Sequence, residues 1–182
     1  MGKIVALTYV SLDGVMENPS WAGAYFDSDH AKYAHGQLFA ADALLLGRTT
    51  YEAMAAAWPL MEESEGGFAV RMNALPKHVV STTLEQGEWN ATVVRGDLAA
   101  EIAKVKDRYA GDILLYASGR LQNSLIALGL IDELKLWIHP VVAGKGKRLF
   151  PEGTPGTSWT LAGTTSFSTG AVVLDLRPAA RP

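Results

Sequence analysis

Short apolar runs alternate with amphipathic segments along the chain, and this pattern predicts that strands and helices take turns. Continuous apolar runs are typical of strands that are buried on both faces. Such runs cover residues 3–10, 43–46, 78–81, 91–94, 112–116 and 133–138. Apolar positions spaced three or four residues apart predict helices after Asp27, over residues 49–57, after Asp97 and from Leu121 to Gly129. Residues 159–162 and 171–176 predict two last strands, joined across a stretch rich in Gly, Ser and Thr.

This order of elements predicts the fold class. Alternation of strands with helices is typical of a mainly parallel sheet that carries helices on both faces. The two last strands, which follow one another without a helix, predict an antiparallel hairpin at one edge of the sheet. We therefore expect a three-layer α/β fold, in one domain over residues 1–182, around a mainly parallel twisted sheet. Residues 11–27 and 61–75 are predicted to be irregular, and long loops in compact domains are often functional.

Composition narrows the possible functions. The chain has 182 residues, of which 48% are hydrophobic and 19% charged, as expected of a folded globular domain. It has no cysteine, which excludes disulfides, a thiol nucleophile and thiolate metal sites. The net charge of −3 gives no reason to expect nucleic-acid binding. No run approaches the roughly 18–20 apolar residues needed to cross a bilayer, so we expect a cytoplasmic protein without a membrane partner.

Polar residues and glycines follow the predicted strands, where ligands of an open parallel sheet bind. Gly47–Arg48–Thr49–Thr50 and Ser118–Gly119–Arg120 each lie between a strand and a helix. A glycine at this position lets backbone N–H groups approach a phosphate, and the helix N-terminus adds partial positive charge. Two such sites on one sheet suit a dinucleotide. Arg48 and Arg95, with Ser81 and Thr82, could hold a 2′-phosphate, which favours NADPH as the cofactor.

Other chemical signals are weaker. The four histidines are scattered, so no metal site is expected. Trp21 and Trp58 fall in the long loops, where they could line a pocket for a flat ring or could simply pack. The basic run Lys145–Gly146–Lys147–Arg148 could bind a phosphate on a substrate or could be a solvated turn.

Four segments together resemble a known family. They are Ser11–Leu12–Asp13–Gly14, residues 45–52 with the sequence LLGRTTYE, residues 77–83 with KHVVSTT, and residues 130–150 with LIDEL, PVVAGKG and LF in order. The chain is similar to the dihydrofolate reductase-like fold, and in particular to the reductase domain of the bifunctional riboflavin-biosynthesis deaminase/reductase. It departs from that family after the fifth strand, where Ala117–Ser118–Gly119 replaces a Gly-Gly or Gly-Ser-Gly motif. Because the chain has no cysteine, we do not expect the family's zinc deaminase domain.

The resemblance implies hydride transfer from NADPH and suggests roles for particular residues. Leu12, Asp13 and Gly14 would flank the nicotinamide. The cofactor's phosphates and adenosine would be bound by Gly47, Arg48, Thr49, Thr50, Ser81, Thr82, Arg95, Ser118, Gly119, Arg120 and Leu121. Asp13, Asp27 and Asp29 are candidates to supply a proton, directly or through a water. Trp21, Tyr51 and Trp58 would contact the substrate.

The implied function is therefore that of an NADPH-dependent reductase of a small heterocyclic compound. A compound like 5-amino-6-(5-phosphoribosylamino)uracil, of riboflavin biosynthesis, is the first candidate substrate, and a pterin is the second. The alternative is a nucleotide-binding module that keeps the fold without catalysis. The resemblance also suggests a homodimer, to which apolar strand residues such as Trp137 and Ile138 could contribute.

Overall fold

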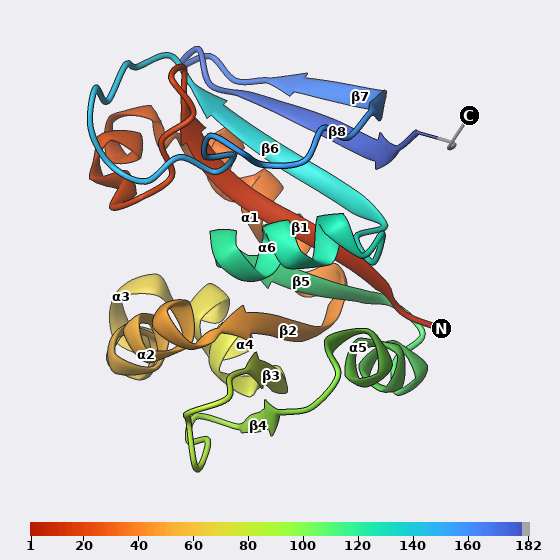
Figure 1. Ribbon diagram of the computed structural model, residues 1–182. Coiled ribbons are helices and arrows are strands. Elements are labelled where there is room, and N and C mark those ends of the chain that lie inside the picture. Colours follow the sequence, from red (N-terminus) through yellow and green to blue (C-terminus); the bar gives the residue numbers. More distant parts are fainter. Residues whose placement is uncertain (180–182) are drawn as a thin grey trace.

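A computed structural model describes residues 1–179, which form a single eight-stranded sheet covered by helices (Figure 1). The strands are β1 (Lys3–Ser11), β2 (Ala41–Gly47), β3 (Lys77–Val80), β4 (Ala91–Val94), β5 (Asp112–Tyr116), β6 (Glu133–His139), β7 (Trp159–Ser166) and β8 (Val172–Pro178). Their order across the sheet is β4-β3-β2-β5-β1-β6-β8-β7. The first six strands are mutually parallel, whereas β8 is antiparallel to both β6 and β7. The predicted mainly parallel sheet with an antiparallel edge hairpin is confirmed.

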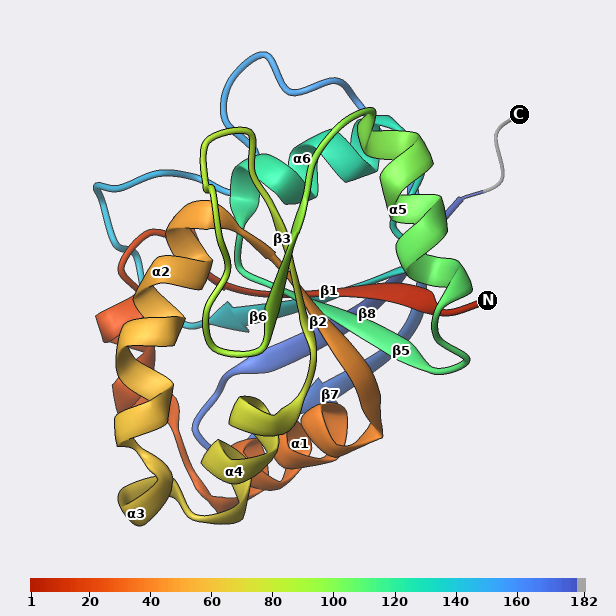
Figure 2. The same ribbon diagram turned by 90° about the horizontal axis from the view of Figure 1, so that it is seen from below.

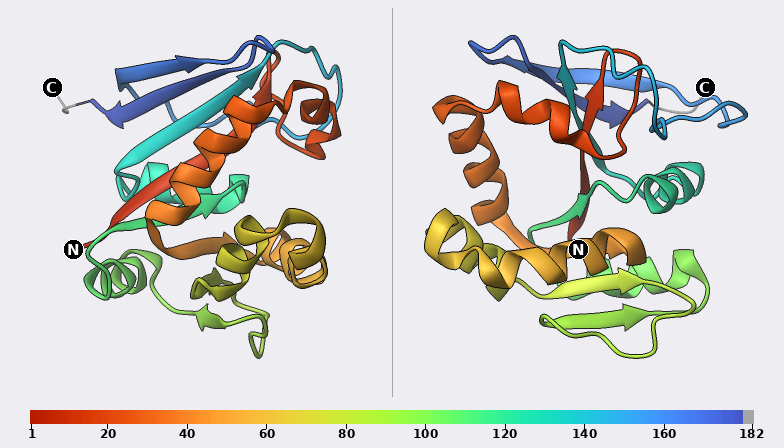
Figure 3. Two further views of the ribbon diagram at one scale, coloured as in Figure 1. Left: turned by 180° about the vertical axis from the view of Figure 1, so that it is seen from behind. Right: turned by 90° about the vertical axis from the view of Figure 1, so that its left-hand side faces the viewer.

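Helices cover both faces of the sheet, as the alternating pattern predicts (Figure 2). Helices α1 (Ser28–Ala40), α2 (Arg48–Ala57) and α4 (Gly67–Ala74) pack on one face, and α5 (Leu98–Asp107) and α6 (Gly119–Ala127) on the other. Side-chain oxygens of Asp27 and Asp97 cap the first turns of α1 and α5, so these two helices begin where the sequence predicts. Figure 3 shows α1 on one side of the sheet and α6 on the other.

The core has two halves because side chains alternate between the two faces of each strand. On β1, Val5 and Leu7 belong to the half under α1 and α4, whereas Ile4 and Ala6 belong to the half under α5 and α6. All four side chains are buried. Strand β1 lies in the middle of the sheet and is covered on both faces, which explains why its apolar run is longer than those of the other strands.

The structure corrects the prediction that residues 61–75 are irregular. They contain the one-turn helix α3 (Glu62–Glu65) and helix α4, preceded by a short 3₁₀ helix η2 (Trp58–Leu60). Gly66, at a φ of +55°, separates α3 from α4. Buried Ala69 and Met72 hold α4 against the sheet, so tertiary packing stabilises a helix that is too short and too rich in weak helix formers to be evident in the sequence. Residues 11–27 likewise include a 3₁₀ helix, η1 (Pro19–Tyr25).

The connections that leave the neighbouring strands β1 and β5 run toward opposite edges of the sheet. The connection from β1 leads past β5 to β2, and the connection from β5 leads past β1 to β6. The carboxyl ends of β1 and β5 therefore flank a switch point of the sheet, the position at which ligands bind in open α/β folds. No helix within the described residues is long and apolar enough to span a membrane.

Candidate functional site

A cavity of about 520 Å³ opens at this switch point, on the face that carries α1 and α2. Its volume is in the range of small-molecule binding sites. Residues from β1, β5, β6, four helices and the loop after β1 line it: Leu7, Thr8, Tyr9, Met16, Pro19, Phe26, Ala34, Gln37, Thr50, Met54, Trp58, Met61, Glu65, Phe68, Met72, Tyr116, Ala117 and Trp137. We call it the switch-point cavity.

The lining of the switch-point cavity is mostly aromatic and methionine side chains. Six aromatic rings and four methionines suit the faces of a flat ring, and the flexible thioethers can adapt to its outline. The polar exceptions are few. Burial raises the pKa values of Tyr9 and Tyr116 well above the usual range, so both phenols keep their protons at neutral pH and offer O–H donors.

The N-termini of α2 and α6 lie side by side next to this cavity. The backbone N–H of Gly47 donates to Ser118 Oγ at 2.9 Å, and these two residues immediately precede α2 and α6. Within the described chain, no side chain caps the first turn of either helix. Thr50 of α2 and Ala117, just before α6, also line the cavity. The arrangement therefore places two sets of N–H donors and two helix dipoles where they can bind an anion.

The turn between β5 and α6 has unusual backbone geometry. Ala117 and Ser118 both adopt the left-handed conformation, with φ values of 45° and 52°. Residues other than glycine rarely do so, and such strain concentrates at ligand sites. A Cβ at Gly119 would collide with Met16 Sδ, so this turn also packs closely against the loop after β1.

Arg48 links α2 to the loop after β3. Its guanidinium donates to Glu52 Oε1 at 2.7 Å and to Thr83 Oγ1 at 2.6 Å. Ser81 Oγ accepts from the backbone N–H groups of Thr83 and Leu84, which closes the turn after β3. The structure thus brings Arg48 and the Ser81–Thr83 turn together, as expected for a phosphate site.

The other predicted cofactor residues do not all lie beside Arg48 and the turn after β3. Arg95 donates to the backbone oxygen of Leu84, so it lies beside the same turn. Thr49, Thr82 and Arg120 are exposed on the surrounding surface. The side chain of Leu121 is buried in the core under α6, so Leu121 would contribute to the predicted cofactor site only through its backbone N–H, in the first turn of that helix.

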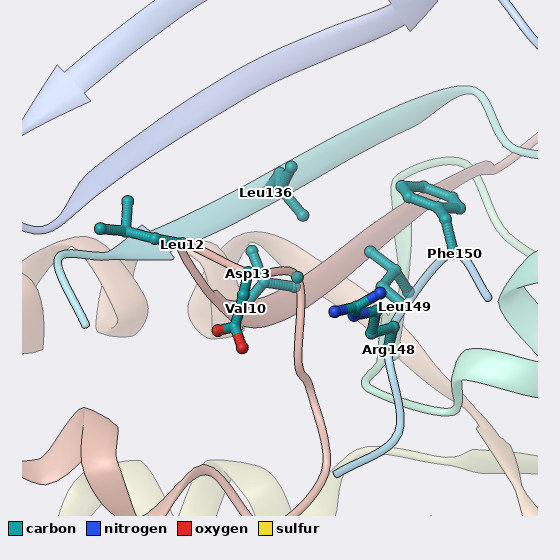
Figure 4. Close-up of a pocket in the computed structure, with 8 residues that line it drawn as sticks. Val10, Leu12, Asp13, Leu136, Arg148, Leu149 and Phe150 are labelled. Carbon is teal, nitrogen blue, oxygen red and sulfur yellow. The ribbon is translucent and has the colours of Figure 1, made fainter. Parts of the chain in front are cut away.

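Leu12, Asp13 and Gly14 line a second cavity, of about 460 Å³, rather than the first (Figure 4). Its remaining lining residues are Val10, Leu136, Arg148, Leu149 and Phe150. Side-chain alternation along β1 and β6 sets Val10 and Leu136 on the opposite sheet face from Tyr9 and Trp137. The residues predicted to flank a nicotinamide therefore do not line the switch-point cavity.

Asp13 joins two loops. Its carboxylate accepts hydrogen bonds from Ser11 Oγ at 2.6 Å and from the backbone N–H groups of Ala143 and Gly144, both at 2.9 Å. These bonds lower the pKa of Asp13 to about 2, the Ser11 hydroxyl contributing most. A carboxylate that is fully ionised at neutral pH has no proton to give. The geometry corrects the prediction for Asp13, which positions the loop after β1 against the loop after β6.

Asp27 and Asp29 do not line the switch-point cavity either. Asp27 accepts from the N–H groups of Asp29 and His30 at the start of α1, and its other oxygen accepts from Ser168 Oγ. The His30 N–H is the largest cause of the lowered pKa of Asp27. Asp29 is exposed and pairs with Lys32. Both are capping and surface residues of α1, which corrects their prediction as proton donors.

Of the three predicted substrate contacts, Trp58 lines the cavity and the other two do not. Tyr51 is buried, and its hydroxyl donates to the backbone oxygen and accepts from the backbone N–H of Glu88. Trp21 packs edge-on against His139. Most of the cavity lining, including Tyr9, Tyr116 and Trp137, was not among the predicted site residues. The alternation of side chains along strands could have identified these three, because they point to the same face of the sheet as Leu7.

Comparison with known proteins agrees with this fold. The model of the RibD C-terminal domain family matches residues 2–173. The uncharacterised Bacillus subtilis protein YyaP is 29% identical over 172 residues, which cover 93% of this chain and 92% of YyaP.

Two solved structures have the same fold. A Shewanella sp. PV-4 protein assigned to riboflavin biosynthesis superimposes with a TM-score of 0.71 at 18% identity, over 98% of this chain and 99% of its own. Dihydrofolate reductase from Enterococcus faecalis, solved with NADP(H) bound, gives a TM-score of 0.67 at 16% identity, over 98% and 97%. The chain has the dihydrofolate reductase-like fold and belongs to the RibD C-terminal domain family.

Proposed function

We propose that this protein is an NADPH-dependent reductase that transfers a hydride to a flat heterocyclic substrate. The observation that carries the proposal is the pair of uncapped helix N-termini, joined by the Gly47–Ser118 hydrogen bond, beside a cavity lined by aromatic rings. Family membership and a fold shared with a reductase that binds NADP(H) support it.

The residues present fit a phosphorylated dinucleotide. The first turns of α2 and α6 would hold the pyrophosphate through backbone N–H groups, since Gly47 and Gly119 present no side chain there. Arg48, with the hydroxyl groups of Thr82 and Thr83, would hold the 2′-phosphate, because a guanidinium matches two phosphate oxygens. Exposure of these three side chains at one edge of the sheet supports this role.

The chain's own contribution to catalysis is positioning and exclusion of water. When bound, NADPH supplies the hydride. Thr50 and Ala117 line the cavity next to the two helix N-termini, so they would contact the reacting ring. Trp58 would stack against the substrate, and the buried Trp137 would form the wall behind it. Together they would keep water away from the substrate and hold the reactants together, which lowers the barrier.

Reduction of a C=N or C=O bond also needs a proton. Tyr9 and Tyr116 are the titratable groups of the lining that keep a proton at neutral pH, because burial raises the pKa of each phenol. Each would donate a hydrogen bond from its Oη to the substrate, and the proton itself would come from a solvent water.

The alternative, a nucleotide-binding module without turnover, is favoured by one observation: the three candidate aspartates all lie outside the lining of the switch-point cavity. Oxidation of NADPH, followed by absorbance with a panel of flat heterocycles that carry C=N or C=O bonds, separates the two. We expect oxidation that depends on the acceptor, with a raised KM in Trp58→Ala and an unchanged KM in the control Trp159→Ala on β7. NADPH binding without oxidation by any acceptor would favour the module instead.

A further inference from the structure

The switch-point cavity carries an unusual balance of charge. Within the described residues, its lining contains no Lys, Arg or His and one charged side chain, that of Glu65. The segment between Arg48 and Arg71, which supplies α2, α3 and the start of α4, has four glutamates and no basic residue. A ligand in this cavity therefore meets a carboxylate at its rim and no cationic side chain, and the partial positive charges of the α2 and α6 N-termini beside it are those that the cofactor's phosphates would occupy.

The basic side chains on the surrounding elements are engaged elsewhere. The backbone oxygen of Lys147 accepts a hydrogen bond from the N–H of Met16, which lines the cavity, but the Lys147 ammonium lies 3.0 Å from Glu17 Oε1. The guanidinium of Arg71 on α4 donates to the backbone oxygen of Ala41 at 2.6 Å. Lys135 on β6 pairs with Glu133 and Asp175. Each would have to break these contacts to reach a ligand.

The remaining candidates for a phosphate site also lie away from the cavity. Arg148, of the basic run at residues 145–148, lines the second cavity on the opposite sheet face (Figure 4). Arg48 reaches Glu52 and Thr83, on the side where the cofactor's phosphate would bind. Burial in the aromatic cluster lowers the pKa values of His30 and His139, so both imidazoles are neutral at neutral pH.

We infer that the substrate pocket takes a flat, uncharged or cationic aromatic compound and excludes compounds that carry a phosphate or carboxylate on the ring system. An anion there would lose its hydration without a cationic partner and would face the Glu65 carboxylate. A cation or a neutral ring meets aromatic faces and thioethers, which attract both. The inference rests on the proposed function only in taking this cavity as the substrate pocket, and it disfavours a phosphoribosylated pyrimidine.

A matched set of two-ring probes tests the inference. The probes are quinoline, 1-methylquinolinium, quinoline-6-carboxylate and quinolin-6-yl phosphate, titrated at pH 7.5 without NADPH and with excess inorganic phosphate to occupy the N-termini of α2 and α6. The protein's tryptophan fluorescence, to which Trp58 and Trp137 of the lining contribute, reports binding. We expect quinoline and 1-methylquinolinium to bind, and each of the two anions to bind at least about tenfold more weakly, as a charge buried without a partner requires.

Substitution of Glu65 tests whether its negative charge causes the preference among the four probes. Glu65→Gln should weaken the cation about threefold and leave quinoline unchanged, and Glu65→Lys should strengthen both anions, since an exposed charge contributes modestly. Glu63→Gln, on the same turn but outside the lining, is the control and should change none of them.

Binding of the phosphate or carboxylate probe as tightly as quinoline would overturn the inference, and so would failure of all four probes to bind. Neither result bears on NADPH binding, which is measured separately. A failure of NADPH to bind, with the quinoline preference intact, would overturn the proposed function and leave the inference standing.

Discussion

The backbone N–H of Gly47 donates to Ser118 Oγ at 2.9 Å, and this bond joins the starts of two helices that are 71 residues apart in sequence. It brings the carboxyl ends of β2 and β5 into register beside the switch-point cavity. Ser118 makes this contact from the left-handed conformation, with a φ of 52°, which is uncommon for a residue other than glycine and is concentrated at ligand sites.

Gly47→Ala should weaken NADPH without destabilising the fold. A Cβ at Gly47 would lie 3.5 Å from the nearest Ser118 side-chain atoms, which is an ordinary contact, and φ at this residue is −79°. The added methyl group would instead occupy the space through which a phosphate approaches the helix N-terminus. We expect about a tenfold loss in NADPH affinity by calorimetry, equivalent to about 1.4 kcal/mol, with Tm nearly unchanged.

Gly36→Ala is the matched control for that variant. Gly36 lies within α1, where a Cβ would meet open space. It should keep NADPH affinity and raise Tm slightly, because alanine favours the helix. Equal NADPH affinity in both alanine variants would remove Gly47 from the cofactor site.

Asp13→Asn should loosen the contact between the loops after β1 and β6, in a manner that depends on pH. The folded-state pKa of Asp13, about 2, lies below its ordinary value of 3.8, so the stability it contributes is complete above the ordinary value. That contribution is lost as pH falls toward the folded-state pKa. Urea unfolding should therefore show wild type to be more stable than Asp13→Asn at pH 7, by a difference that narrows from pH 4 to pH 3.

Asp29→Asn, at an exposed carboxylate paired with Lys32, serves as the comparison. Its effect on the urea midpoint should be small, as for most surface ion pairs. If Asp13→Asn behaves like Asp29→Asn at pH 7, Asp13 does not hold the two loops together.

His30→Phe should reduce the loss of stability in mild acid. His30 is buried among Phe26, Tyr9 and Trp137, and neither ring nitrogen has a hydrogen-bond partner within the described residues. Burial lowers its pKa from 6.5 to about 4. The unfolded chain takes up a proton near pH 6.5 and the folded protein does not, so stability falls as pH drops from 6.5 toward 4.

Phenylalanine removes that titration and keeps the packing of an aromatic ring. The slope of Tm against pH between 6.5 and 4.5 should be shallower in His30→Phe than in wild type, and unchanged in His35→Gln, whose histidine is exposed. Parallel slopes in all three proteins would show that His30 titrates as it does in the unfolded chain.

Thr8→Val should destabilise the protein because it removes a buried hydrogen bond to Gln122 beside the cavity. Thr8 Oγ1 donates to Gln122 Oε1 at 2.6 Å, and both residues are buried. Valine leaves that amide oxygen without its donor, which costs about 1–3 kcal/mol. The double variant Thr8→Val/Gln122→Met, in which both partners are apolar, should recover part of the loss in urea unfolding. A double variant less stable than Thr8→Val would contradict this reading.

Much of the fold could be predicted from the sequence, and the reasons are local. The apolar run of β1 and the steps of four and three from Leu98 to Ile102 and Val105 encode buried positions directly. Helix α4 could not be predicted, because its stability comes from the burial of Ala69 and Met72 against distant strands.

The candidate site, too, could be predicted from the sequence only in part. Gly47, Arg48 and Ser118 lie at or within two residues of the carboxyl ends of β2 and β5, so sequence position alone brings them to one edge of the sheet. The capping role of Asp27 is local and could be predicted, but its contact with Ser168 and that of Asp13 with Ala143 join residues more than 100 positions apart, which no local pattern reveals. The cavity lining combines seven or more separate elements, so its charge balance emerges only after folding.

The most direct test of the central claim is a titration with NADPH and, separately, NADH, followed by energy transfer from tryptophan to the nicotinamide in wild type, Arg48→Ala and Arg108→Ala. Arg108 is an exposed arginine at the opposite, amino-terminal edge of the sheet. The account predicts that wild type and Arg108→Ala bind NADPH at least about tenfold more tightly than NADH, and that Arg48→Ala binds the two alike. Absent binding of both nucleotides, or equal affinity for both in wild type, would contradict it.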